Sequence, residues 1–492
     1  MGLQLATVLV GVQPRWSRQE PVLPPFWQTV VLGEVVTDSR EVGPGDLFLA
    51  LKGERTDGHD YLADVLARGA RGALVAQPSL VEKTATLTGS RPWVVVDPTT
   101  GAGLAEAPPD ACLLIAVDDP LMAVQRLAVY YRRKLTPTVV GITGSVGKTS
   151  TKEVTAAVLG RRFRTLKSKR SFNSEATLPT TLLRLTATHE VAVLEMGMWA
   201  PGEIRFLADL ARPTVGVVTN VGPSHLERMG SLAAIANAKA ELPESLPPEG
   251  WCILNADDPL VAAMAERTRA QVFRFGIDPQ ADLWASNLVS HGLEGISFTA
   301  HYQNQMIPLQ LPLLGLHSVY TALAAISVGL VLGMAWHEII VGLADPEATP
   351  RVRLLTATNG ATLIDDSYNA APLSTLAALD LLARTPGRPV AVLGDMLELG
   401  AAEVEGHQQV GRRAAEVAAI LVTVGPRARI IAAAARDAGL DPALVVECTD
   451  KVTALTALRA LIKPDDCVLI KGSRGMELEQ IVAALGRNQE EE

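Results

Sequence analysis

The sequence is poor in cysteine and in positive charge, and both shortages exclude classes of protein. It has four cysteines, none in a C-x-x-C pair, so neither a disulfide framework nor a cysteine zinc site is expected. Lysine and arginine total 44 against 53 aspartate and glutamate residues, and the resulting net charge of −9 argues against general nucleic-acid binding. We therefore expect a cytoplasmic protein with reduced thiols and no nucleic-acid partner.

The chain also lacks the apolar segments of a membrane protein. Its N-terminus has no basic segment before a short apolar run, which argues against a signal peptide. The uncharged stretch 318–336 is long enough to span a membrane, but it is rich in alanine and contains serine, threonine, tyrosine and glycine. A buried helix fits this composition better, so no membrane span is expected.

With 492 residues the chain is too long for one hydrophobic core, and its pattern predicts three α/β domains. Residues 1–108 mix short strands with turns. Residues 109–346 alternate short apolar strands with helical stretches, which is typical of a parallel sheet, and add an antiparallel part over 273–313. Residues 347–492 predict a smaller Rossmann-like domain without a G-x-G-x-x-G dinucleotide motif, followed by a disordered tail over 488–492.

Short apolar runs bounded by turn residues give the expected strands. They are 35–36, 47–51, 72–75 and 93–96 in the first block, 138–142, 191–195, 215–220 and 251–255 in the second, and 361–364, 390–393, 420–424 and 467–470 in the third.

What the chain does contain is a phosphate-binding loop. The segment T-G-S-V-G-K-T, from Thr143 to Thr149, follows a β-branched run and precedes a helical pattern over 150–159. Such a loop directs backbone N–H groups and the positive end of a helix at phosphates, while the lysine adds charge and the threonine hydroxyl can ligate Mg²⁺. The common form G-x-x-x-x-G-K-[ST] needs glycine at position 142, where this chain has Ile142.

Three further polar residues lie at the end of an expected strand, shortly after one, or on the helix that follows. Glu195 ends a strand, where a carboxylate either ligates Mg²⁺ or is capped or salt-bridged. His225 follows another strand, and beside a phosphate-binding loop it becomes a candidate cation ligand, although such a histidine is more often structural. Lys239 on its own predicts a solvated surface charge. The basic run of Lys167, Lys169 and Arg170 either neutralises an anionic ligand or is solvated.

Several motifs occur together and in order: T-G-S-V-G-K-T, L-E-M-G at 194–197, H-L-E-R-M-G-S-L at 225–232, A-K-A-E at 238–241 and I-D-D-S-Y-N-A-A-P at 364–372. With them the chain resembles the Mur ligases, ATP-dependent amide-bond-forming enzymes of peptidoglycan synthesis. Further segments favour the member that joins D-alanyl-D-alanine to UDP-N-acetylmuramoyl-tripeptide: D-S-R at 38–40, L-P-T-T-L-L-R-L at 178–185, V-L-G-D-M-L-E-L-G at 392–400 and K-G-S-R-G-M at 471–476.

The resemblance implies a cytoplasmic, monomeric enzyme that uses ATP and Mg²⁺ and reacts through an acyl phosphate. Its domains would bind UDP, ATP and the incoming amine in chain order, with Lys148, Glu195, His225 and Lys239 as catalytic residues. The ATP-binding residues would be Thr143, Gly144, Ser145, Val146, Gly147, Lys148, Thr149, Ser150, Arg353 and Asp366. The metals would be held by Thr149, Glu195, His225 and a carbamylated Lys239, and the nucleotide-peptide substrate by Ser39, Arg40, Lys52, Gly53, Asn173, Ser174 and Glu175.

One departure from the family pattern concerns the adenine. The family shows asparagine at two positions that are Ser318 and Thr321 here, so the resemblance leaves the base contacts of this chain open.

Two other functions are weighed against this one. The first is a ligase for another amine, either a single amino acid or the glutamate of folylpolyglutamate synthases; the D-S-R segment disfavours the folate enzyme, and the lack of a D-N-P-R motif disfavours a diaminopimelate-adding enzyme. The second is a P-loop switch protein without ligase activity, which would need no second metal ligand such as His225.

Overall fold

The computed structural model describes residues 2–16, 21–53, 56–77, 79, 87, 92–345 and 352–487. It divides into two compact units, which are described separately. The first comprises residues 1–139, 164–196 and 205–213, and the second comprises residues 140–163, 197–204 and 214–492. The predicted boundary near 346 and the predicted disordered tail over 488–492 lie outside the described residues.

The first unit contains a parallel five-stranded sheet in the order β3-β4-β5-β7-β6. Its strands are β3 (Val35–Val36), β4 (Leu47–Leu49), β5 (Gly72–Ala76), β6 (Trp93–Val96) and β7 (Cys112–Val117). Four of them coincide with expected strands. The fifth, β7, lies beyond residue 108, and every one of its residues is buried because it is flanked by β5 and β6.

The N-terminal segment covers this sheet together with a long helix. The short strands β1 (Leu3–Gln4) and β2 (Val31–Leu32) pair antiparallel, and helix α1 (Leu5–Gly11) packs against α5 (Pro120–Arg132). The remaining helices of this part are α2 (Pro25–Gln28) and α3 (Leu62–Ala67). The first unit also holds β9 (Thr165–Lys167), β10 (Val191–Glu195), α7 (Thr177–Leu182) and most of α8 (Glu203–Ala211), and β10 pairs with β9 in parallel.

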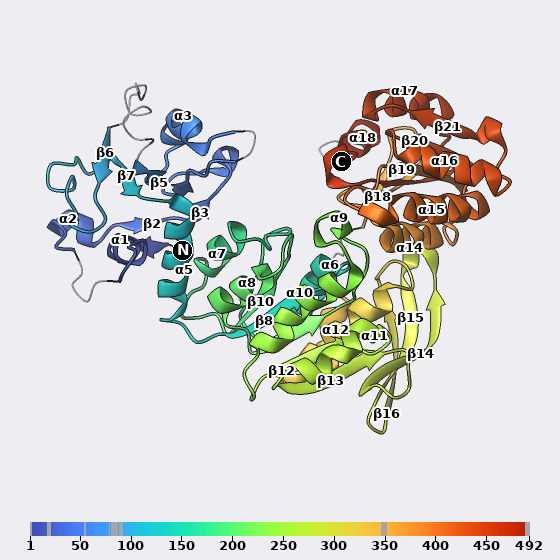
Figure 1. Ribbon diagram of the computed structural model, residues 1–492, viewed down its shortest axis with the longest axis horizontal. Helices are drawn as coiled ribbons and strands as arrows, with labels where there is room; N and C mark the ends of the chain where they lie inside the picture. Colours follow the sequence, from blue (N-terminus) through green and yellow to red (C-terminus); the bar gives the residue numbers. More distant parts are fainter. Residues whose placement is uncertain are drawn as a thin grey trace. The chain divides into compact units, whose positions relative to one another are not determined.

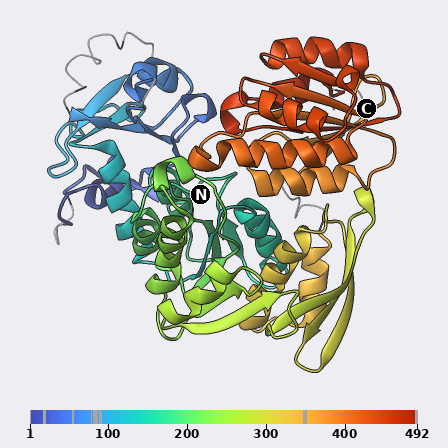
Figure 2. The ribbon, with the colours of Figure 1, turned by 45° about the vertical axis from the view of Figure 1, so that its right-hand side comes forward.

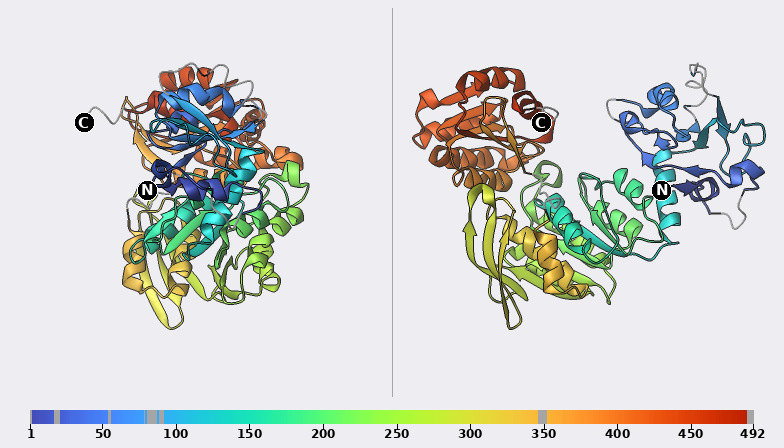
Figure 3. Two further views of the ribbon diagram at one scale, coloured as in Figure 1. Left: turned by 90° about the vertical axis from the view of Figure 1, so that its left-hand side faces the viewer. Right: turned by 180° about the vertical axis from the view of Figure 1, so that it is seen from behind.

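In the second unit a mixed sheet has the order β16-β15-β14-β13-β12-β11-β8. Its parallel part is β8 (Thr138–Thr143), β11 (Val215–Val218), β12 (Trp251–Asn255), β13 (Gln271–Gly276) and β14 (Leu283–Ser290). The expected antiparallel addition is confirmed in β14, β15 (Ile296–Tyr302) and β16 (Gln305–Leu311), which are drawn in yellow tones in Figure 3. The strand β11 ends at Val218, two residues before the expected end.

Helices α6 (Lys148–Leu159), α10 (Leu232–Ser245), α11 (Pro259–Ala262) and α12 (Ser318–Val331) accompany this sheet (Figure 1). The same part of the chain also contains α9 (Leu226–Met229) and α13 (Trp336–Leu343). Helix α12 is the uncharged stretch of the sequence, and it packs against α6 and α13 with most of its side chains buried. Across the described ranges, no helix combines the length and the apolar character needed to cross a membrane.

The C-terminal part of the second unit is a six-stranded sheet in the order β17-β18-β22-β19-β20-β21, parallel except for the pair β17–β18. Its strands are β17 (Arg353–Thr356), β18 (Thr362–Asp366), β19 (Arg388–Gly394), β20 (Ile420–Val424), β21 (Val445–Cys448) and β22 (Asp466–Lys471). The predicted Rossmann-like arrangement is confirmed. Its helices are α14 (Pro372–Leu382), α15 (Glu403–Val417), α16 (Ala428–Asp437), α17 (Lys451–Leu461) and α18 (Glu479–Leu485), drawn in orange to red in Figure 2.

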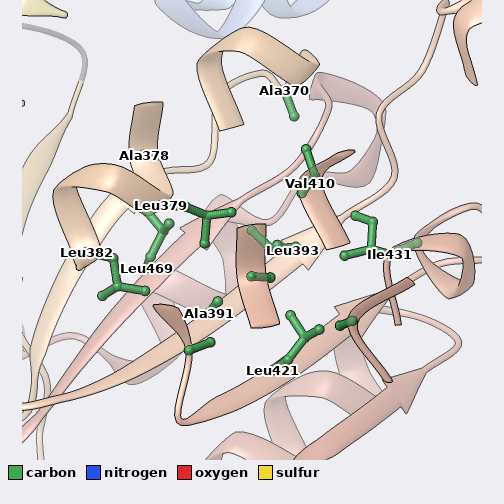
Figure 4. Close-up of a cluster of buried hydrophobic side chains, with 14 of the residues drawn as sticks. Ala370, Ala378, Leu379, Leu382, Ala391, Leu393, Val410, Leu421, Ile431 and Leu469 are labelled. Carbon is green, nitrogen blue, oxygen red and sulfur yellow. The ribbon is translucent and has the colours of Figure 1, made fainter. Parts of the chain in front are cut away.

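Side chains along these strands alternate between the two faces of the sheet and form a separate hydrophobic core on each face. Ala391 and Leu393 of β19 face α14, α15 and α16, and Figure 4 shows them among leucine, alanine, valine and isoleucine side chains from those helices. Val390 and Val392 point to the opposite face, where α17 and α18 cover the sheet. Because successive side chains of a strand point to opposite faces, a run of apolar residues is what a sheet covered on both sides requires.

Candidate active site

The phosphate-binding loop lies where it was expected, between the end of β8 and the first turn of α6. Gly147 precedes the helix with a left-handed backbone at φ +85. Gly144 has φ +148, and a Cβ at this position would lie 1.9 Å from Thr219 Oγ1. Only glycine fits at position 144, because any side chain would both strain the backbone and collide with Thr219.

The residues after β11 clamp this loop. Asn220 accepts a hydrogen bond from the Val146 N–H through Oδ1 and donates one to the Val146 carbonyl through Nδ2, both at 2.9 Å. Thr219 Oγ1 donates to the same carbonyl at 2.7 Å. Ser145 N–H donates to the Asn220 carbonyl at 3.0 Å, and Gly222 N–H donates to Ser145 Oγ at 2.8 Å. The strand stops at Val218 because residues 219–222 turn to bond the loop instead.

Lys148 lies inside the curve of the loop. Its Nζ donates to the carbonyl of Gly144 at 2.7 Å and to that of Ser145 at 3.3 Å. The ammonium group therefore lies next to the first N–H groups of α6, which have no carbonyl partner within the helix. A lysine beside such N–H groups forms a site of positive potential suited to phosphate.

His225 lies in the same unit as the loop, at the start of α9. Its backbone is left-handed at φ +59, and its Nδ1 lies 2.5 Å from Glu398 Oε2. Burial lowers the pKa of His225, the Glu398 carboxylate opposes this, and the charges of Lys148 and Lys239 lower it further. The net direction is downward, so the ring is neutral at neutral pH, which is the form that ligates metals.

Lys239 lies within α10, whose first turn is capped by Ser231 Oγ accepting from the Ala234 N–H at 3.1 Å. Its side chain is buried, with a relative exposure of 2%. The interpretation of Lys239 as a solvated surface charge is therefore wrong. Burial, and next the charge of Lys148, place its pKa well below the ordinary value for lysine. Its amine is thus shifted toward the neutral, nucleophilic form.

Glu195 and Asn173 form one contact in the first unit. Glu195 ends β10, is 1% exposed, and its Oε1 accepts a hydrogen bond of 2.7 Å from Asn173 Nδ2. The neighbouring Ser174 and Thr177 hydroxyls are 3.0 Å apart, and the carbonyl of Glu175 accepts a hydrogen bond from Gln125. Two of the predicted substrate and metal residues, Asn173 and Glu195, are therefore in direct contact.

The remaining predicted substrate residues of the first unit follow two neighbouring parallel strands. Ser39 and Arg40 form a short 3-10 helix after β3, and Lys52 and Gly53 come after β4. Arg40 is exposed and pairs with Asp38, whose pKa it lowers, with Nη2 2.6 Å from Oδ2. Because the carboxyl ends of parallel strands share one edge of the sheet, the two segments lie at the same edge.

The basic segment of the first unit is paired with acidic residues. Lys169 forms an ion pair with Glu34, and Arg170 Nη1 lies 2.9 Å from Glu41 Oε1. Burial acts to raise the pKa of Glu34, but Lys169 and Arg184 outweigh it and lower the pKa. A small recess is lined by these charged residues and by apolar and threonine side chains: Glu34, Val35, Val36, Thr37, Glu41, Lys169, Phe172, Thr180, Thr181 and Arg184.

Arg353 and Asp366 do not pair with each other. Arg353 is exposed, and its Nη2 donates to Asp365 Oδ2 at 2.7 Å. Asp366 accepts from Lys471 Nζ at 2.5 Å, and the same ammonium donates to the Asn369 carbonyl at 2.9 Å. The charge of Asp366 also acts on His317, where it opposes the desolvation that lowers the pKa of this histidine.

The two positions that depart from the family pattern point inward. Ser318 is buried, and its Oγ donates to the Leu314 carbonyl at 2.7 Å, while Thr321 is buried within α12. The next residue toward the chain start, Tyr320, is held by Asp257, and burial raises its phenol pKa to a value above the ordinary range. Base contacts of the family kind would therefore have to come from other side chains.

Among the described residues, no group of three or more histidine, cysteine, aspartate or glutamate side chains is arranged to hold a metal ion. Sequence reasoning placed Asn220 at a strand end near the loop but did not predict its bonds to the loop, and it missed Glu398. Asn220 holds the phosphate-binding loop, and Glu398 bonds His225 from a segment more than a hundred residues away. Asn220 is the last residue of the expected strand 215–220, and Glu398 lies in the turn after the expected strand 390–393, which was the available signal for it.

Comparison with known proteins identifies the family. The sequence matches the family models described as "Mur ligase family, catalytic domain" over residues 32–132, "Mur ligase middle domain" over residues 142–329, and "Mur ligase, glutamate ligase domain" over residues 350–474. The chain belongs to the Mur ligase family, a class of three-domain ATP-dependent ligases.

Two of its relatives carry the same name. The UDP-N-acetylmuramoyl-tripeptide--D-alanyl-D-alanine ligase of Mycobacterium tuberculosis is 38% identical over 484 residues, covering 92% of each chain. The enzyme of that name from Escherichia coli is 36% identical over 93% of this chain and 95% of its own. Crystal structures of MurF from Acinetobacter baumannii (TM-score 0.76, 30% identity, 98% of both chains) and of MurF from Thermotoga maritima in complex with ADP (TM-score 0.71, 26% identity, 92% and 96%) share the fold.

Proposed function

We propose that the protein joins D-alanyl-D-alanine to UDP-N-acetylmuramoyl-tripeptide with ATP, in the cytoplasm, as a step of peptidoglycan precursor synthesis. The terminal carboxylate of the tripeptide attacks the γ-phosphate of ATP, which forms an acyl phosphate and releases ADP. The amine of the dipeptide then attacks the acyl carbon, and phosphate leaves. The names of relatives that match the chain over most of its length support this substrate pair.

The observation that carries the proposal is the grouping of Lys148, His225 and Lys239 at the phosphate-binding loop of the second unit. The loop from Thr143 to Ser150 binds the phosphates of ATP, with Arg353 and Asp366 as further contacts to the nucleotide. Phosphoryl transfer needs positioning and neutralisation of charge more than covalent help, and the loop N–H groups and Lys148 provide both. A switch protein would not need a buried lysine and a neutral histidine beside this loop.

By the chemistry of their side chains, the proposed metal ligands are of kinds that suit magnesium. Thr149 offers a hydroxyl oxygen, Glu195 a carboxylate and His225 a neutral imidazole, and these are the groups that the family resemblance assigns to the metals. Bound Mg²⁺ would neutralise charge that develops on the transferred phosphoryl group. The protein residues bind and orient the phosphoryl group and its charge. The new bonds form between groups of the substrates, the carboxylate and the amine.

Lys239 fits the carbamate that the family resemblance implies. A neutral amine is the form that adds carbon dioxide, and burial favours the neutral form of Lys239. The carbamate converts a buried amine into an anion beside the cationic Lys148. We therefore expect activity of the wild type to fall in carbonate-depleted buffer and to return with bicarbonate, and we expect Lys239→Ala to lose most activity. The exposed Lys463 provides the control Lys463→Ala, which keeps full activity.

The nucleotide-peptide substrate is proposed to bind in the first unit. Ser39, Arg40, Lys52 and Gly53, at one edge of the parallel sheet, bind the UDP end. Asn173, Ser174 and Glu175 line the path of the muramoyl peptide. The ion pair between Lys169 and Glu34, and the one between Arg170 and Glu41, lie beside these residues, so the basic run is neutralised here by the protein itself.

We propose domains over 1–108, 109–346 and 347–492, with the incoming dipeptide bound by the third; the place of β7 in the first sheet favours a first boundary after Val117. A monomer is expected, and sedimentation velocity across a range of concentrations tests it. A single species of the mass of one chain supports a monomer, and a concentration-dependent mass contradicts it.

A matrix of substrates tests the function. Phosphate release from ATP is measured with each UDP-muramoyl peptide against single amino acids, glutamate and D-alanyl-D-alanine. We expect release only when the tripeptide nucleotide and the dipeptide are both present. Release that is equally fast without the dipeptide contradicts the proposal, and release that depends on a single amino acid assigns the protein to a different amine. Nucleotide hydrolysis that is independent of any UDP-sugar supports a switch protein.

A further inference from the structure

The contact between His225 and Glu398 joins two turns that are both built for it. His225 begins α9 with φ +59, and Glu398 follows β19 with φ +64. Both residues therefore have a left-handed backbone, which residues other than glycine rarely adopt. Besides the side-chain contact of 2.5 Å, the Glu227 N–H donates to the Glu398 carbonyl at 3.2 Å. Backbone strain of this kind persists where surrounding structure holds it, and it clusters at functional sites.

The turn that carries Glu398 is held from behind. His407 Nε2 accepts from the Met396 N–H at 3.1 Å, and Ser473 Oγ accepts from the Leu397 N–H at 2.8 Å. The Ser473 N–H in turn donates to the Asp395 carbonyl at 3.0 Å. Each peptide from 395 to 397 is therefore fixed to the C-terminal domain, and the carboxylate of Glu398 is presented by a rigid turn.

Close packing leaves this turn little freedom. Gly400 has φ +51, and a Cβ there would lie 2.9 Å from the Cα of Glu227. Figure 1 shows α9 beside the C-terminal domain, in agreement with its contact to residues 400–402. On the side of α9, the ring of Trp199 lies 6.4 Å from that of His225, and the guanidinium of Arg228 lies 4.7 Å from the Trp199 ring centre. The imidazole is thus bounded by Trp199 and by Glu398.

The chemistry of the contact fixes the tautomer of the ring. A carboxylate only accepts hydrogen bonds, so His225 Nδ1 carries the proton that is shared with Glu398. In a neutral imidazole the other nitrogen, Nε2, then has a free lone pair. Histidines that ligate metals are commonly oriented in this way, with the second ring nitrogen bonded to a carboxylate.

We propose that Glu398 is a positioning residue that holds the Nε2 atom of His225 ready for the divalent cation, so that the C-terminal domain completes the metal site of the ATP-binding domain. The proposal rests on the proposed function only for the presence of a divalent cation at His225. It is independent of which amine the enzyme accepts. An alternative is that Glu398 merely joins the two domains, as an ion pair that is partly exposed and contributes little energy.

Full-length Glu398→Ala and Glu398→Gln test the proposal. The matched control is Glu405→Ala, because Glu405 is an exposed glutamate of the same domain that bonds Gln409 and Arg412 on the surface. The first readout is the dissociation constant of Mn²⁺ in the presence of ADP, measured by electron paramagnetic resonance. The second is the tautomer of His225 in the metal-free protein, read from the ring nitrogen shifts of ¹⁵N-histidine-labelled protein and assigned with His225→Gln.

We expect Glu398→Ala to weaken Mn²⁺ binding by about ten- to hundredfold and to lose the signature of the Nδ1-protonated ring. Glu398→Gln, which retains an oxygen acceptor, is expected to lie between the alanine variant and wild type. ADP binding without metal and the melting temperature should match those of Glu405→Ala. Unchanged Mn²⁺ affinity and tautomer in Glu398→Ala overturn the proposal, as does a wild type that binds no Mn²⁺ with ADP. An unexpected amine in the substrate matrix overturns the proposed function instead and leaves this proposal standing.

Discussion

Replacing Asn220 with alanine removes two hydrogen bonds to Val146, one residue of the phosphate-binding loop. The Val146 N–H loses its acceptor, and the Val146 carbonyl keeps only the bond from Thr219 Oγ1 among those described. A neutral hydrogen bond contributes about 1 kcal/mol net, so the ordered loop loses about 2 kcal/mol. If binding of the nucleotide has to restore the loop, this loss weakens ADP affinity by about thirtyfold.

Isothermal titration with ADP measures this effect, and thermal unfolding shows whether the protein remains folded. The control is Gln310→Ala, an exposed amide on the edge strand β16, which should leave ADP affinity unchanged. Thr219→Val tests the same reasoning from the other side, because it removes the remaining side-chain donor to the Val146 carbonyl. We expect the double variant Asn220→Ala/Thr219→Val to lose more than the two single losses combined. Native ADP affinity in Asn220→Ala, with a native melting temperature, would refute the clamp.

Three further predictions follow from burial and backbone geometry. Gly144→Ala should abolish nucleotide binding because its Cβ would collide with Thr219. Gly147→Ala has no atom within 4 Å of its Cβ, so it should cost the ligand-free protein only about 1–2 kcal/mol in urea unfolding. The same loss of unfolding free energy in both variants would contradict the clash. Lys239→Met should stabilise the ligand-free protein in carbonate-free buffer, because burial lowers the pKa of Lys239 in the folded protein. The buried lysine destabilises the fold fully at pH values below its pKa in the folded protein, and this effect disappears above the pKa of the unfolded lysine, about 10.4. A gain in stability that does not shrink as the pH rises to that value would contradict the burial argument. Cys252, with a pKa raised to about 12 by burial, should resist alkylation by iodoacetamide in mildly alkaline buffer until the protein unfolds, and rapid labelling of the folded enzyme would show otherwise.

Local patterning predicted the sheets well because apolar runs between turns are sufficient to mark strands covered on both faces. The strands at Val191–Glu195, Trp251–Asn255 and Ile420–Val424 have the predicted bounds. The error at β11 has a local cause that depends on a distant segment. The pattern predicts a strand through Thr219 and Asn220, which directly follow an apolar run, but the side chains of these two residues bond the phosphate-binding loop.

Other features of the site depend on contacts between segments far apart in the sequence. Lys239 has the sequence context of a solvated helix lysine, and only the packing around α10 shows that it is buried. Glu398 lies in a motif that supported the family resemblance, yet its contact with His225 depends on how two domains meet. The expected roles of Ser39, Arg40, Lys52 and Gly53 stay predictions, because geometry at the sheet edge is compatible with them but does not test them.

The chemical residues of the second unit occupy the carboxyl ends of strands in two different sheets. The phosphate-binding loop and His225 follow β8 and β11, while Asp366, Lys471 and the Glu398 turn follow β18, β22 and β19. Parallel strands leave side chains and loop N–H groups at this end without a further neighbour in the sheet, so ligands collect there. The contacts from His225 to Glu398 and from α9 to residues 400–402 bring these two edges together. An enzyme that makes a reactive acyl phosphate from ATP needs the amine to approach the same point, and two sheets that meet by their carboxyl edges satisfy that requirement without a covalent contribution from the protein.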